Sequence, residues 1–543
     1  MRRAFGIAYD FVGAGNDSTE DSSPSTLAAG SVSHALSPDL VFGSPRSKDL
    51  EPLSLSLTQI IMIEAAYRTH VDPVVKVFHS TSAWDCIGHD GHPGWEAENM
   101  DLTRASDQCL FRAICFVTAV ATDGKGMDAP LGFHGQALIE KFRIDAEVAL
   151  SRAKFMKTRD FRVLQALTLY LIALQSLGDD ETVWMVLGIV IRIASVLGLP
   201  HDVSEEAASR SAHSSYRLEM MRRLWWAIVA LDARVTRILG RTGYLSHNFN
   251  LIPRQANVDD NRLSPSMIDI AEDSTGLTDV VYVRYRATLS DVLPFIYASG
   301  NSKEKSSGIL EMIADAEHRI EDQFMQHCDK SVPIQLLTLI AGRGYIKRVK
   351  LAMYSIYPDA EDATTQVPYA SEAFWLAKDS MDLFILLWTD PSLKQWQWHW
   401  RDFFGWHTLR MLVREIAKRS SCSKVIDAWK LVKKAASLAV TALRLGEEKA
   451  RLVGDLRMLI EAADVQAVTS LDSYSPGTGA MVRSIMPGMG SNPHNALFPG
   501  MGSSLAVSRN TDGNADAVEF DLKKVNWTEI DRILLQLGTY IGG

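Results

Sequence analysis

Hydrophobic residues recur at helical spacing through most of the chain between residues 102 and 466. The segment DFRVLQALTLYLIALQSLG (160–178) is apolar around its whole circumference, which predicts a helix that is buried on all sides and ends at Gly178. The next segment, DDETVWMVLGIVIRIASVLGLP (179–200), predicts a second long helix. Strand-type alternation between hairpin turns is hard to find. The pattern predicts an all-α protein built as a large multi-helix bundle.

Changes in composition divide the chain into four regions. Residues 1–48 are rich in Ser, Gly, Pro and Asp and predict a flexible leader. Residues 49–470 predict an all-helical body, and residues 471–515 predict a linker rich in Gly, Pro, Met and Ser. Residues 516–543 contain VNWTEIDRILLQLGTY, which predicts one short amphipathic helix that docks back on the body.

Charge and cysteine content narrow the class of protein. Lys and Arg total 56 against 65 Asp and Glu, so the net charge of -9 argues against the whole chain acting as an electrostatic nucleic-acid binder. The five cysteines are odd in number and widely scattered, which favours a reducing compartment over a disulfide framework. No stretch is apolar for long enough to predict a membrane span. The N-terminal apolar run is interrupted by Asp10, which disfavours a secretory signal.

The segment LEMMRRLWWAIVALDARVTRILGR (218–241) predicts a helix with two contrasting faces. One face is apolar and includes Trp225, whereas Trp226 and Arg222 lie at its edge. The opposite face carries Arg223, Arg234, Arg237 and Arg241. This basic face could bind phosphate or an acidic partner, or it could simply be exposed to solvent. We favour the solvated face, on which Glu219 and Arg223 would form an i,i+4 ion pair.

Asp232 stands out because the helical projection places it within the apolar face. An unpaired carboxylate there would cost several kcal/mol, about as much as breaking a buried ion pair. We therefore predict a buried basic partner, and Arg192 of the preceding helix is the candidate.

Signals for an enzyme or a metal site are weak. The run DDETV (179–183) has Val183 where an aspartate-rich magnesium motif needs a carboxylate, so Asp179 and Asp180 are interpreted as the start of a helix. HDGHP (89–93) offers ligand types without the rest of a metal site. The aromatic run WQWHWRDFFGWH (396–407) is interpreted as core rather than as a pocket. No catalytic, cofactor-binding or metal-ligating residue is predicted.

The order of motifs in the body resembles the middle homology region, or regulatory region, of fungal-specific transcription factors. The resemblance covers roughly residues 50–466, with its core at 160–262. In that family a W-x-x-x-G-x-A-x-R block precedes an R-R-x-W-W block with a following aspartate, a G-R turn and a closing P-x-x-x-D-D. The residues that match and that we expect to be structural are Trp184, Gly188, Arg192, Arg222, Arg223, Trp225, Trp226, Asp232, Gly240, Arg241, Pro253, Asp259 and Asp260.

The resemblance implies a nuclear regulator of transcription, often of a metabolic or secondary-metabolite gene cluster. Its partners would be other transcription regulators or the transcription machinery, and a small-molecule effector is a further expectation. Members usually carry an N-terminal cluster in which six cysteines hold two zinc ions. This sequence has five cysteines, none spaced as C-x2-C, so we expect no zinc cluster and place direct DNA binding in doubt.

Two functions of other classes stay open. One is a helical biosynthetic enzyme that uses an aromatic pocket between Trp396 and Trp406, with His399 and His407 as its chemical groups. The other is a cytosolic scaffold, which differs from the regulator mainly in its location.

Overall fold

The computed structural model describes residues 53–79, 105–125, 135–199, 215–239, 241, 245, 253–267, 272–289, 306–356, 369–400, 404–419, 422–442, 447–472 and 525–541. Within these ranges every regular element is a helix, so the predicted all-α multi-helix fold is confirmed. The α-helices are α2 Leu57–His70, α3 Asp72–Val75, α5 Ala105–Thr122, α7 Gly135–Arg152, α8 Phe161–Ser176, α9 Asp180–Val196, α12 Ser215–Leu239, α13 Val281–Leu289, α15 Ser306–Gln323, α16 Pro333–Ile356, α17 Tyr369–Thr389, α18 Trp406–Ala417, α19 Ser423–Ala442, α20 Glu447–Asp472 and α21 Trp527–Ile541. The 3-10 helices are η3 Phe155–Lys157, η4 Asp260–Arg262, η6 Met325–His327 and η7 Pro391–Trp400.

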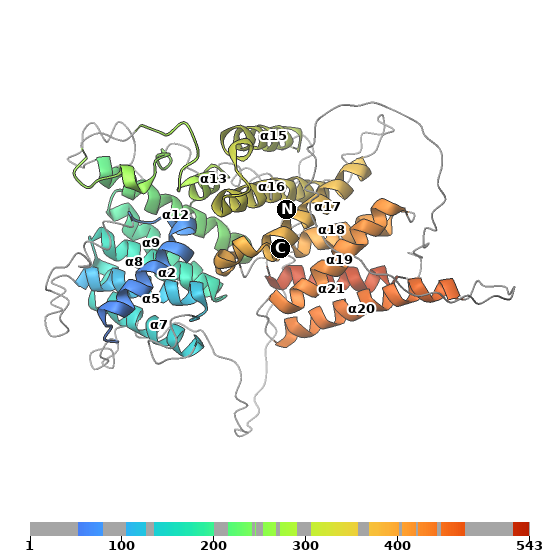
Figure 1. Ribbon diagram of the computed structural model, residues 1–543, viewed down its shortest axis with the longest axis horizontal. Coiled ribbons are helices and arrows are strands. Elements are labelled where there is room, and N and C mark those ends of the chain that lie inside the picture. Colours follow the sequence, from blue (N-terminus) through green and yellow to red (C-terminus); the bar gives the residue numbers. More distant parts are fainter. Residues whose placement is uncertain are drawn as a thin grey trace, which may run out of the picture.

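The helices gather at two ends of an elongated body. Helices α2 to α12 lie together at one end, α17 to α21 lie at the other, and α13, α15 and α16 run between them (Figure 1). One continuous hydrophobic core passes through both ends. The 3-10 helix η7 joins them, because the indole N–H groups of Trp396 and Trp398 donate to the carbonyl oxygens of Thr69 and His70 at 3.1 and 2.8 Å.

Helix α8 is the central helix of the first end, as its uniformly apolar sequence predicts. Every residue from Val163 to Ser176 is buried, and α8 packs against α5, α7 and α9. The chain leaves α8 through Gly178, whose φ of +87° lies in the left-handed region that favours glycine. Helix α9 then begins at Asp180 with Asp179 as its N-cap, which confirms the interpretation of this run as a helix start.

Helix α21 lies against α18 and α20 (Figure 1). Arg410 of α18 donates from Nε and Nη2 to the two carboxylate oxygens of Asp531 at 2.8 and 2.9 Å. The rings of Trp429 and Trp527 meet edge to face at 5.6 Å. Helix α21 therefore packs on the body through an ion pair and an aromatic contact.

Some sequence predictions fall outside the described residues. These are the leader 1–48, the HDGHP run and residues 473–515 of the linker; residues 471 and 472 belong to the end of α20. None of the helices in the described part of the chain is apolar over a length that would cross a membrane.

Candidate functional site

A buried ionic cluster holds together the segments that carry the family-like motifs. Lys76 follows α3 with a φ of 46°, a left-handed conformation that is uncommon for lysine. Its Nζ lies 2.8 Å from Asp72, 2.9 Å from Asp260 and 2.7 Å from Asp279. Although burial opposes the charge, these carboxylates raise the pKa of Lys76. The strained backbone is thus compensated by three ion pairs around one ammonium group.

Arg223 of α12 joins the same cluster from the other side. Its Nη1 lies 2.6 Å from Asp260 and its Nε lies 3.0 Å from Glu219, and only 1% of Arg223 is exposed. Burial alone would raise the pKa of Asp260, but the positive charges of Arg223 and Lys76 hold this pKa well below its usual range. Asp260 therefore remains charged between two buried cations and fixes η4 to α12.

The chain from residue 253 to 263 is tied to α12 by two more hydrogen bonds. The amide of Ala256 donates to Glu219 at 2.9 Å, and the indole N–H of Trp226 donates to the carbonyl oxygen of Pro253 at 3.0 Å. The guanidinium of Arg254 lies over the Trp226 ring at 5.1 Å. The R-R-x-W-W block and the closing segment from Pro253 to Asp260 therefore meet in space; in this chain five residues, rather than the family's three, separate the proline from the two aspartates.

Two predictions for α12 need correction. Arg223 was expected on a solvated face, yet it is fully buried; the predicted pair with Glu219 does form, but in the interior. Trp226 and Arg222 were expected at the edge of the apolar face, yet they are 2% and 5% exposed; Trp225 is also 2% exposed. The physical reason is that α12 packs against α8, α9 and α13 and also against the 253–263 segment, so its arginine face is covered as well.

The predicted pair between Asp232 and Arg192 is wrong. Asp232 is buried, as expected, but its carboxylate accepts the amide of Leu245 at 3.2 Å. Arg192 is exposed, and its Nη1 donates to the carbonyl oxygen of Gly188 in its own helix at 2.8 Å. A projection of α9 by itself could not show that this side of the helix faces outward.

The other motif residues occupy peripheral contacts. Arg241 lies over the ring of Trp184 at 4.2 Å and pairs with Glu181 in the first turn of α9 at 2.8 Å. Asp259 accepts the amide of Asp279 at 2.9 Å. Arg222 is buried in α12, whereas Gly240 lies outside the described residues.

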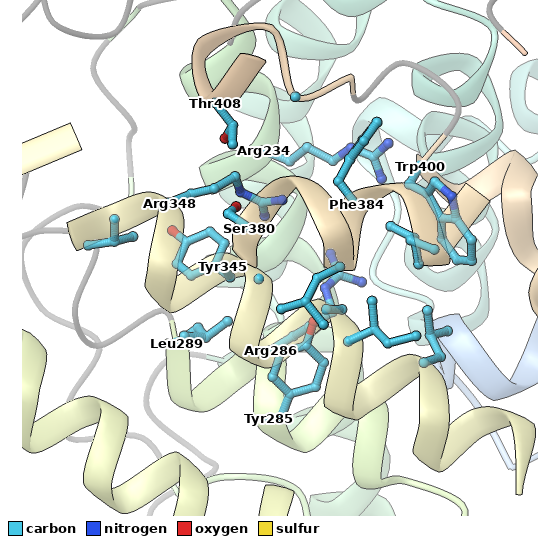
Figure 2. A pocket seen from close by; sticks show the side chains of 18 of the residues that line it. Arg234, Tyr285, Arg286, Leu289, Tyr345, Arg348, Ser380, Phe384, Trp400 and Thr408 are labelled. Carbon is cyan, nitrogen blue, oxygen red and sulfur yellow. The ribbon is translucent and has the colours of Figure 1, made fainter. Parts of the chain in front are cut away.

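A cavity of about 210 Å³ lies where α12, α13, α16, α17, η7 and α18 meet. Its wall contains four arginines, Arg234 and Arg237 from α12, Arg286 from α13 and Arg348 from α16. Figure 2 labels Arg234, Arg286 and Arg348. Aromatic and aliphatic side chains form most of the remaining wall, among them Tyr285, Leu289, Tyr345, Phe384 and Trp400. His399 and His407 belong to the aromatic run that the sequence offered as a pocket only in the enzyme alternative, and Arg234 and Arg237 belong to the basic face that was expected to be solvated.

His399 sits between two of the arginines. Nη1 of Arg286 donates to its Nε2 at 3.0 Å, and Nη1 of Arg234 donates to its carbonyl oxygen. Because Nε2 accepts this bond, the ring is neutral with its proton on Nδ1. Burial, with Arg286 and Arg234, lowers the pKa of His399 well below its ordinary value. Burial, with Arg410 and Arg414, lowers the pKa of His407 to about 4.

The aromatic run 396–407 divides between core and cavity. Trp396, Trp398 and Trp406 are buried in the core, as predicted, while His399, Trp400 and His407 line the cavity. The described residues contain no group of three or more metal-ligating side chains. The cavity is thus an arginine-rich, partly aromatic enclosure with neutral histidines.

Sequence reasoning missed Arg286 and Arg348, although a signal for them exists. Each follows a tyrosine on the same side of a largely apolar helix, Tyr282 before Arg286 and Tyr345 before Arg348. The guanidinium groups lie over those rings at 5.7 Å. An arginine within an apolar helix next to a tyrosine marks a buried cation, but the pattern does not show that three helices direct such cations into one space.

Residues 71–262 match the family described as "Fungal specific transcription factor domain". This range contains Lys76, Arg223 and Asp260, so the ionic cluster lies within the matched domain. This match confirms the resemblance noted in the sequence.

The chain is also similar to curated fungal regulators. It is 25% identical to "Aurofusarin cluster transcription factor aurR2" of Gibberella zeae, over 73% of this chain and 58% of the relative. It is 23% identical to "Pyriculol/pyriculariol biosynthesis cluster transcription factor 1" of Pyricularia oryzae, over 80% of this chain and 59% of the relative. It is 23% identical to "C6 finger domain transcription factor nscR" of Aspergillus fumigatus, over 76% of this chain and 54% of the relative. The chain thus spans little more than half of each of these relatives.

Proposed function

We propose that this protein is a transcription regulator that controls a secondary-metabolite biosynthetic gene cluster. The observation that carries the proposal is the match of residues 71–262 to a fungal specific transcription factor domain. Two of the relatives quoted above are named as regulators of biosynthetic clusters, which supports the choice of target genes. We place the protein in the nucleus on the same grounds.

The regulator acts through partners, which are other transcription regulators or components of the transcription machinery. The 543-residue sequence has five cysteines, and the family's zinc cluster needs six thiolates. In this proposal, a protein that associates with this body recognises the promoter. We propose a regulatory rather than an enzymatic role, because the matched domain and the relatives quoted above are those of transcription factors.

The helical body presents an activation function and changes its output when an effector binds. The arginine-lined cavity is the candidate effector site, because α12 connects it to the ionic cluster. A second, smaller cavity is lined by Arg223 and Trp226 as well as by Arg234, Arg286 and His399. A ligand that moves Arg234 would therefore act on the same helix that holds the 253–263 segment.

A tethering assay tests the proposal. The full chain is fused to a heterologous DNA-binding domain and directed to a reporter promoter in a fungal host. We expect a several-fold change in reporter transcription relative to the DNA-binding domain alone. An unchanged reporter with a stably expressed nuclear fusion would contradict the proposal.

A gel-shift experiment tests the dependence on partners. The purified chain is expected to bind promoter DNA only weakly and without sequence preference at physiological salt. Tight, sequence-specific binding by the isolated chain would overturn this part of the proposal and leave the tethering result unaffected.

A further inference from the structure

The cavity concentrates positively charged side chains in its wall. Its described wall contains four arginines and two histidines and no aspartate or glutamate. Burial and the nearby Arg237 lower the pKa of Arg348 to about 10, so the folded protein disfavours this charge. Like charges held together in a desolvated space are typical of a site that receives the opposite charge from a ligand.

The wall also offers two hydroxyl groups that have no hydrogen-bond partner among the described residues. Ser380 of α17 and Thr408 of α18 are each 1% exposed. Within the described part of the chain, Ser380 Oγ and Thr408 Oγ1 make no hydrogen bond. Buried polar atoms without partners are rare and costly. In Figure 2, Ser380 and Thr408 lie on the same side of the cavity as the guanidinium of Arg348.

The rest of the wall suits an apolar body rather than a small inorganic anion. Tyr345, Phe384, Tyr285 and Leu289 present rings and a branched aliphatic chain to the cavity (Figure 2). The volume of about 210 Å³ exceeds the roughly 150 Å³ of an engineered apolar cavity that accepts benzene. One or two fused rings with a single acidic group are therefore of suitable size.

We infer that the cavity binds a small organic anion with an aromatic body, an aromatic carboxylate or phenolate. Its acidic group lies at Arg348, Ser380 and Thr408, where a guanidinium and two hydroxyls donate hydrogen bonds. Its ring lies among Tyr345, Phe384 and Tyr285. The inference rests on the proposed function only in assigning this anion the role of effector; the binding itself follows from the cavity.

Calorimetric titration of the purified full-length protein tests the inference, with 2-naphthoate as the anionic probe and 2-naphthamide as its neutral counterpart. The two probes share their rings and differ in charge. We expect 2-naphthoate to bind at least about ten-fold more tightly than 2-naphthamide, because a charge-assisted hydrogen bond is about twice as strong as a neutral one. Equal affinities, or no binding of either probe to folded protein, would overturn the inference.

Two variants locate the acidic group. Arg348→Met is expected to weaken 2-naphthoate binding by about ten-fold or more while leaving 2-naphthamide unchanged. Ser380→Ala should weaken it less, by about three- to ten-fold, because a single neutral donor is lost. Arg457→Met, at an exposed ion pair with Glu461 on α20, is the matched control and should bind as the wild type does.

The outcome separates this inference from the proposed function. Selective binding of 2-naphthoate that persists undiminished in Arg348→Met would show that the anion binds elsewhere and would overturn the site. A protein that fails to bind either probe yet changes transcription in the tethering assay would refute only the ligand class. A protein that binds 2-naphthoate but leaves the reporter unchanged would refute only the regulatory role.

Discussion

Nη1 of Arg223 lies 2.6 Å from Oδ1 of Asp260, and this contact joins the middle of α12 to the closing motif 37 residues later in the chain. Both residues belong to the motif strings that resemble the family, and the structure gives them a common physical role. Together with Lys76 they form a buried ionic cluster that fixes three segments of the domain.

Removing Arg223 should strongly destabilise the fold. Arg223→Met leaves Glu219 and Asp260 without a buried cation, and breaking a buried ion pair typically costs about 3 to 5 kcal/mol. Thermal and denaturant unfolding measure the loss. Arg457→Met removes an exposed pair on α20 and should cost less than about 1 kcal/mol. Similar losses in the two variants would contradict a structural role for the cluster.

The two adjacent tryptophans of α12 should differ in cost when each is replaced by phenylalanine. Both are 2% exposed, so both lose a similar ring volume. Trp226 also loses its hydrogen bond to Pro253, whereas Trp225 Nε1 has no hydrogen-bond partner within the described residues. We expect Trp226→Phe to cost about 1 kcal/mol more than Trp225→Phe in the free energy of unfolding. The reverse order would argue against the tie to Pro253.

Arg348 should behave in the opposite way to Arg223. Burial and the nearby Arg237 lower its pKa, so its charge is unfavourable in the folded protein. We expect Arg348→Met to leave the free energy of unfolding unchanged or to raise it by up to about 1 kcal/mol, with a melting temperature that is equal or higher. Such a gain is common when a binding residue is removed. A loss as large as that of Arg223→Met would indicate a structural ion pair and count against a binding role.

The buried histidines of the cavity predict a dependence of stability on pH. Burial and nearby arginines lower the pKa of His407 from 6.5 to about 4, so the unfolded chain binds this proton more readily than the folded protein does. The contribution of neutral His407 to the free energy of unfolding is fully present above pH 6.5 and decreases as the pH falls toward 4. At about 1.4 kcal/mol per pKa unit, the change amounts to about 3 kcal/mol.

The variant His407→Gln isolates this effect from other groups that titrate in the same range. Between pH 6.5 and 4, the stability of the variant should fall less steeply than that of the wild type. Denaturant unfolding at several pH values measures both slopes. His318→Gln is the control, since His318 lies exposed on α15 at 81%. Identical slopes for the wild type and His407→Gln would show that His407 is not kept neutral by its surroundings.

The sequence was sufficient to predict the helices and the domain, because periodicity and glycine stops are local signals. The predicted limits of α8 at Gly178 and of α9 near Asp179 agree with the structure. The motif residues Arg223, Trp226 and Asp260 lie in one connected set of contacts between α12 and the 253–263 segment.

The partners of buried charges could not be predicted in the same way. Asp232 was correctly placed in the interior, yet its hydrogen bond goes to Leu245 rather than to Arg192. The helical projection gave Arg223 a solvated face because it treats a helix as covered on one side only. Arg286 and Arg348 come together with Arg237 only through the packing of α12, α13 and α16, which no single helix encodes.

Transcript profiling of a strain that lacks the gene tests the central claim most directly. We expect a coordinated set of transcripts from one biosynthetic gene cluster to fall together and to return when the wild-type gene is restored. Unchanged transcripts, accompanied by the loss of a single metabolite, would contradict the account and would favour a biosynthetic enzyme instead.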